Sequence, residues 1–113
     1  MDPGTYNFTM YQGASFAKQL ILKEDSVVRD ISGYTGRMQI RDKLTKALIV
    51  TMTTENDKIV ITGASGRIDL VLVATETELF NFNKALYDLE IINGTTVERV
   101  LQGEITLDRN KTV

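Results

Sequence analysis

Hydrophobic and polar residues alternate with a period of two in short runs along this chain, and turn residues separate the runs. In the clearest run, 34–41, Tyr34, Gly36, Met38 and Ile40 share one face and the intervening residues are polar. Such alternation is typical of half-buried strands in an antiparallel sandwich or barrel. The pattern therefore predicts a long strand here with one face on a core.

Similar alternation marks the other expected strands. In 47–53 it places Leu48, Val50 and Met52 on one side. The remaining expected strands cover 5–10, 15–22, 27–28, 58–62, 67–73, 85–92 and 95–107.

Two short signals predict how these strands are connected. Asn93-Gly94 lies between alternating runs and predicts a tight hairpin, because both central residues of its commonest turn need a positive φ. The apolar phase then changes along the return strand, which predicts a kink near Gln102-Gly103. Thr75 followed three residues later by Glu78 has capping-box spacing, so we expect a helical turn over 75–80 that bridges two sheets.

About eight short strands with regular turns predict an all-β fold, an immunoglobulin-like antiparallel β-sandwich with one short helical turn. Val, Ile and Thr make up 33 of the 113 residues, and these β-branched side chains favour strands. At this length we expect a single domain over 1–113, with 108–113 as a flexible tail.

Composition removes several classes of chemistry. The chain has no Cys, His or Trp, which excludes disulfides, thiolate nucleophiles and Ser-His catalytic pairs. The net charge is −2 without a basic stripe, so we expect no nucleic-acid binding. No apolar run reaches the roughly 18 residues of a membrane helix, and no secretory signal is visible. We expect synthesis in the cytoplasm, no cofactor and no small-molecule substrate.

Motifs that suggest catalysis have simpler explanations. Gly63-Ala64-Ser65-Gly66-Arg67 looks like a phosphate-binding loop, but it joins two β-runs and lacks the Lys and the helix of that motif. We interpret it as a hairpin turn. Asp88 and Glu90 lie two apart on one strand, where a solvated sheet face would place them. No catalytic or metal-binding residue is therefore predicted.

Some outward positions suggest an interaction surface instead. Strands 67–73 and 85–92 carry apolar residues on both faces, which predicts cover by a loop or by another subunit. A basic row on strand 34–41 could bind an acidic partner, but we favour the alternative of a solvated face crossed by salt bridges. The candidate interaction residues are Val71, Val73, Ile92, Arg37, Gln39 and Arg41.

The order of short motifs resembles a family of small virion proteins of tailed bacteriophages, and more distantly the N-terminal domain of the upper baseplate protein of lactococcal phages. The resemblance covers nearly the whole chain and implies an immunoglobulin-like sandwich with a structural role in the virion. Its motifs are GTYNFT at 4–9, QGASF at 12–16, ISGYTGRMQIR at 31–41, GRI at 66–68, YDLE at 87–90 and LQGEITL at 101–107.

From this resemblance we expect a non-enzymatic virion structural protein of the tail, baseplate or fibre-attachment region. Its partners would be other virion proteins, in a homo- or hetero-oligomer. The alternatives are a head decoration protein or a carbohydrate-binding β-sandwich module for host attachment. A sugar site usually needs exposed aromatic rings, whereas most Tyr and Phe residues here fall on inferred core faces, with Tyr11 as the main exception.

Overall fold

The computed structural model of this protein describes residues 4–109. It is mostly β-strand, at 59%, with almost no helix, which confirms the all-β, sandwich-like prediction. There are more strands than expected because the first run divides at Tyr6–Asn7 and a short hairpin forms at 23–28. The elements are β1 (Gly4–Thr5), β2 (Phe8–Tyr11), β3 (Phe16–Ile21), β4 (Lys23–Glu24), β5 (Val27–Val28), β6 (Thr35–Asp42), β7 (Leu48–Thr53), β8 (Ile59–Thr62), the 3₁₀ turn η1 (Gly63–Ser65), β9 (Arg67–Leu72), α1 (Ala74–Thr77), β10 (Lys84–Asn93) and β11 (Thr96–Asp108).

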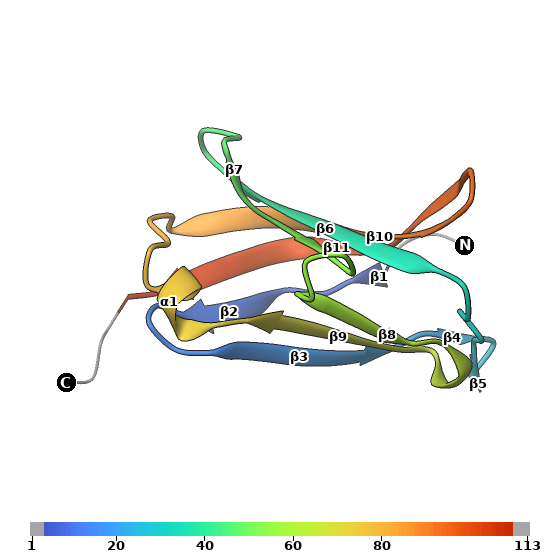
Figure 1. The fold of residues 1–113 in the computed structure, drawn as a ribbon. Coiled ribbons are helices and arrows are strands. Elements are labelled where there is room, and N and C mark those ends of the chain that lie inside the picture. The colour runs from blue at the N-terminus through green and yellow to red at the C-terminus, as the bar shows by residue number, and fades with distance from the viewer. Residues whose placement is uncertain (1–3, 110–113) are drawn as a thin grey trace.

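Two sheets form the layers of the molecule (Figure 1). The larger has the order β1-β11-β10-β6-β7, with β2 also paired to β11, and the smaller has the order β3-β9-β8. Strands β4 and β5 form a separate hairpin. Because β1 and β2 run parallel to β11, the prediction of a purely antiparallel sandwich is wrong at this edge. No tight turn joins these strands, so their connection does not impose an antiparallel order.

The core lies between the two sheets. Met38 and Ile40 of β6, Ile68 and Leu70 of β9, and Leu89 of β10 are fully buried. Their spacing by two confirms the alternation predicted for these three strands.

Strand β7 departs from its predicted alternation. Val50 pairs with Ile40, but Leu48 pairs with Arg41, so Ile49 is an extra residue in the ladder. The bulge changes the phase of the strand and leaves Leu48 49% exposed. The prediction that Leu48 shares one side of the strand with Val50 and Met52 is therefore wrong.

The hairpin between β10 and β11 forms as predicted, but its turn lies one residue further along the chain. Asn93 pairs with Thr96, so Gly94 and Thr95 are the two central residues. Of the two, Gly94 alone has a positive φ, of 62°. Asn93 therefore ends a strand and needs no positive φ.

The irregularity in β11 is also real but displaced from Gln102-Gly103. The register shifts opposite Leu89 and Glu90, so Val100 is the extra residue, and its side chain is 96% buried. Gly103 has a different role. A Cβ atom at this position would lie 2.1 Å from the main-chain oxygen of Tyr6, so the N-terminal segment passes β11 where no side chain blocks it.

The helical turn α1 connects the two sheets as expected but is not held by the predicted capping box. Its N-cap residue is Val73, which has no side-chain oxygen to cap the helix. Thr77, fully buried at the other end, accepts a hydrogen bond from the Gly13 main-chain N–H at 3.1 Å and donates to the Ala14 carbonyl at 2.8 Å. Tertiary bonds to the β2–β3 turn therefore fix α1.

Two edge strands carry features that oppose pairing with another chain. Lys18 lies on the core-facing side of edge strand β3 and donates to the Tyr6 hydroxyl. At the edge of β7, the Asn56 amide donates to the Thr51 carbonyl and accepts from the Thr53 N–H, both at 3.0 Å. Inward charges and occupied backbone groups are known protections of sheet edges.

The predicted flexible tail falls partly outside the described residues. Asp108 is the last residue of β11 and is paired with Tyr11, so the prediction is wrong at its first position. Residues 110–113 lie outside the described part of the chain.

Candidate functional site

One end of the sandwich gathers the β6–β7 loop, α1 and the start of β10 (Figure 1). The loop is tightly folded because the Asp42 carboxylate accepts the main-chain N–H groups of Leu44 at 2.8 Å and Thr45 at 3.2 Å. Lys46 completes the turn with a φ of 67°. This backbone leaves the Leu44 side chain 90% exposed.

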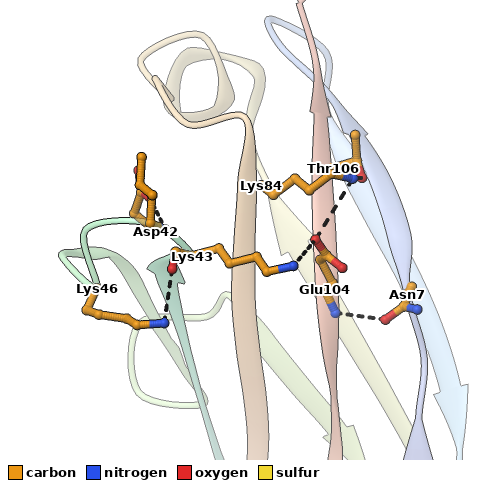
Figure 2. A network of polar contacts seen from close by, with 8 residues as sticks. Asn7, Asp42, Lys43, Lys46, Lys84, Glu104 and Thr106 are labelled. Atoms are coloured by element: carbon orange, nitrogen blue, oxygen red, sulfur yellow. Dashed lines mark hydrogen bonds and ion pairs between the residues drawn. The ribbon is translucent and has the colours of Figure 1, made fainter.

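A pair of lysines beside this loop shares a single carboxylate oxygen (Figure 2). Lys43 Nζ lies 3.1 Å and Lys84 Nζ 3.9 Å from Glu104 Oε1. Lys84 also donates to the Thr106 hydroxyl at 3.2 Å, and the Glu104 main-chain N–H donates to Asn7 Oδ1 at 2.9 Å. Both lysine side chains are about half exposed, so the cluster presents positive charge to solvent.

Two neighbouring hollows open beside the lysines, and Asp42 and Asn81 line both of them. The larger, of about 500 Å³, is bordered by Leu44, Lys43 and Lys84. The smaller, of about 380 Å³, has a mainly apolar lining: Ala47, Ile49, Val50, Leu79, Phe80 and Phe82.

Leu79 rims the smaller hollow and is 80% exposed. It directly follows α1, and the backbone here is fixed by the Gln12 amide, which donates to the carbonyls of Glu78 at 3.2 Å and Phe80 at 2.8 Å. Leu44 and Leu79 have the largest exposed fractions of the large hydrophobic residues in the part of the chain that the structure describes. We call this surface, with Lys43, Lys84 and the two hollows, the leucine–lysine end.

The residues predicted from sequence do not form a single surface. Arg37, Gln39 and Arg41 lie on the outer face of the six-stranded sheet, and Ile92 lies on the same face one strand away and is half-buried. Val71 belongs to the opposite sheet.

The basic row on β6 is partly neutralised by its neighbours. Arg37 forms an ion pair with Glu90 at 2.6 Å, and Arg41 bonds to Gln39 and to the Lys46 carbonyl. The face is thus solvated and crossed by salt bridges, which is the alternative to an acidic partner given by the sequence analysis. Val71 and Val73 are 38% and 52% exposed, as their outward assignment predicts, but Val73 lies at the start of α1.

Sequence reasoning missed the leucine–lysine end, because Leu44 looked like part of a polar loop and Leu79 belongs to no periodic run. The register of the Gly94 hairpin was not enough to find it, because without the Val100 bulge that register would place Lys84 opposite Ile105. The bulge places Lys84 opposite Thr106 and Leu86 opposite Glu104, so Lys84 and Glu104 share the outward face. Only the fold brings Lys43 to the same carboxylate.

The arrangement offers ion pairing and apolar contact. Within residues 4–109, no group of three or more His, Cys, Asp or Glu residues could hold a metal ion. Asp88 and Glu90 are paired with Arg99 at 3.4 Å and with Arg37. In the same residues, no helix is long and apolar enough to cross a membrane.

Comparison with known proteins gives a fold likeness only. No protein-family model and no curated protein matches the chain. The N-terminal domain of ORF48 of phage TP901-1 is similar, with a TM-score of 0.63 and 8% identity over 96% of this chain and 91% of that chain. CopC from Methylosinus trichosporium OB3b has a TM-score of 0.51 and 12% identity over 91% and 86%. The expected distant relationship to a phage domain is thus confirmed for the fold.

Proposed function

We propose that the protein is a non-enzymatic structural component of a bacteriophage virion. The observation that carries the proposal is the likeness to the phage TP901-1 domain over 96% of the chain. The order of motifs that resembles small tailed-phage virion proteins first suggested this role. One fold can serve many functions, and CopC has a similar fold. The proposal therefore also needs a surface suited to the role.

The leucine–lysine end provides such a surface. Two highly exposed leucines beside an apolar hollow favour burial against another protein, because apolar area removed from water stabilises a complex. The tail, baseplate or fibre-attachment region is the proposed location, and other virion proteins are the proposed partners. Contact is proposed through this end and not through the sheet edges, because Lys18 and Asn56 oppose pairing at those edges.

A carbohydrate-binding role is the second candidate and has less support. Tyr11 is 58% exposed, as expected, and Tyr6 is 40% exposed. Neither ring lines the hollows of the leucine–lysine end, and Lys18 lies 4.4 Å from the centre of the Tyr6 ring. A sugar-binding platform needs an open aromatic face next to a groove.

Mass spectrometry of gradient-purified particles of the phage that encodes this chain tests the proposal. We expect the protein in intact particles, in the tail fraction after heads and tails are separated. Recovery with the heads would support a decoration protein, and absence from particles would overturn the virion role. Glycan-array binding by the isolated protein would favour the carbohydrate-binding alternative.

A further inference from the structure

We propose that the leucine–lysine end binds an acidic, apolar peptide segment of another protein, in which Asp or Glu lies beside a large aliphatic or aromatic residue. The inference rests on the proposed function and names the chemistry of the partner. It follows from the charge, the apolar rim and the size of this surface.

The ion pairing of the lysines at this end is incomplete. Lys43 and Lys84 share one oxygen of Glu104, and the second distance, 3.9 Å, is at the limit of an ion pair. The Asp42 carboxylate is also negative and lines both hollows, but it accepts two main-chain N–H groups in the loop and forms no ion pair with either of these two described lysines. An incoming carboxylate would therefore complete the pairing of Lys84, and complementary charge of this kind selects the partner.

The apolar part of the surface lies directly beside these lysines. Leu44 borders the larger hollow and Leu79 the smaller one, and the shared residue Asn81 joins the two. A large side chain that enters the smaller hollow would contact Phe80 and Phe82, while its acidic neighbour reaches the lysines. The two requirements fit adjacent positions of one peptide.

A second copy of this chain fits the surface less well. A two-fold pairing places the same patch of each copy against the other, so Lys43 and Lys84 of both copies would be gathered in one interface. A stable dimer also needs roughly 800 Å² from each partner, whereas exposed leucines at one end supply only on the order of a few hundred Å². A short segment needs far less area.

The test uses two synthetic peptides, acetyl-Gly-Asp-Phe-Leu-Asp-Gly-amide and its counterpart with Asn in place of both Asp residues. Nitrogen-15 NMR of the whole chain follows the backbone amides during titration. We expect the acidic peptide to shift the amides of Leu44, Asn81 and Asn83, while Val27 at the other end stays unchanged. Raising the salt concentration from about 20 mM to about 300 mM should weaken the binding of the acidic peptide more than that of the Asn peptide.

Two variants separate the charged from the apolar contribution. The double variant Lys43→Gln, Lys84→Gln should lower the affinity for the acidic peptide about three- to tenfold, as the loss of partly exposed ion pairs implies. Its affinity for the Asn peptide should stay unchanged. Lys23→Gln is the matched control on β4. Leu44→Ser should weaken the binding of both peptides about tenfold, since it removes the exposed leucine side chain that the bound peptide would bury, and Val27→Ser is its control.

The outcomes distinguish this inference from the proposed function. Equal binding of both peptides, shifts elsewhere, or no shift at millimolar peptide would overturn the docking proposal, even if the protein is found in virions. A dimer by light scattering that Leu44→Ser dissociates would also overturn it in favour of a second copy. Localised, charge-dependent binding with the protein absent from particles would retain the docking chemistry and reject the virion role.

Discussion

Tyr87 donates its phenolic hydrogen to the main-chain carbonyl of Tyr6 at 2.6 Å. The Tyr87 residue is 4% exposed. Burial is the main cause that raises the pKa of its hydroxyl, and Tyr6 adds to the effect. Tyr87 therefore remains a hydrogen-bond donor throughout the ordinary pH range. The bond holds the chain where β1 ends and β2 has not yet begun.

Removing this hydroxyl should destabilise the fold. Tyr87→Phe keeps the ring but leaves the Tyr6 carbonyl without its donor, so we expect a loss of about 1–2 kcal/mol in the free energy of unfolding. Urea unfolding followed by circular dichroism measures it. Tyr11→Phe, at a 58% exposed ring, is the control. Equal stability of both variants would show that the bond contributes nothing.

A side chain at Gly103 should displace the N-terminal segment. The added Cβ of Gly103→Ala would lie 2.1 Å from the Tyr6 oxygen, so β1 or β11 must move, at a cost of about 2–4 kcal/mol. Gly4→Ala is the matched control, because its Cβ would meet Leu101 at an ordinary 3.5 Å. Urea unfolding compares the two, and an unchanged midpoint for Gly103→Ala would contradict the close approach.

The buried hydroxyl of Thr77 should stabilise the connection between α1 and the β2–β3 turn. Thr77→Val preserves the shape but leaves the Gly13 N–H and the Ala14 carbonyl without this partner, so we expect a loss of about 1–3 kcal/mol. The exposed Thr75→Val should change the free energy of unfolding by less than about 0.5 kcal/mol. Thermal unfolding of both variants at several pH values would show whether the loss of stability is larger for Thr77→Val than for Thr75→Val.

The Arg29–Glu98 pair should make stability depend on pH. Hydrogen bonding to Arg29 lowers the pKa of the Glu98 carboxyl, and the two side chains are 18% and 23% exposed. A carboxyl with a lowered pKa in the folded state stabilises the protein above its unfolded pKa of about 4.3, and the contribution disappears as the pH falls through the lowered value.

The matching variant is Glu98→Gln. At pH 7 it should be less stable than the original chain by about 1 kcal/mol, and the difference should shrink as the pH is lowered through the lowered pKa of Glu98. Glu24→Gln on β4 is the exposed control. Urea unfolding across this range decides the matter: a difference that does not change with pH would contradict a role for the charged pair.

Lys18 should keep edge strand β3 from pairing with other molecules. Lys18→Val removes the inward charge from this edge, so we expect faster aggregation, visible as rising light scattering at constant protein concentration. Ala17→Val adds similar bulk to the outward side of the same strand and is the control. If both variants stay equally monomeric, the edge is protected by something else.

Periodicity predicted β6, β9 and β10 because one face of each strand is buried, so apolar and polar residues alternate along it. It could not predict the bulges at Ile49 and Val100, since a bulge depends on how two strands meet. Asn-Gly predicted the hairpin, yet the turn settled at Gly94-Thr95 because the pairing of Asn93 with Thr96 extends both strands.

The candidate site was less predictable than the fold. Leu44 and Leu79 follow no period, because their exposure results from loop geometry fixed by Asp42 and Gln12. The meeting of Lys43 with Glu104 joins residues 61 positions apart. Local pattern carries no information about such a juxtaposition, whereas the residues of one strand face, Arg37, Gln39 and Arg41, were grouped correctly.

The parallel pairing of β1 and β2 with β11 has a consequence for synthesis. Asn7 bonds to Glu104, 97 positions later, so the first strands of the larger sheet have no backbone partner until the ribosome has made nearly all of the described chain. Contacts this distant in sequence are formed slowly. We therefore expect the smaller sheet and the β6–β7 hairpin to form first on the nascent chain, and the N-terminal segment to dock only once β11 has been made and has left the ribosome.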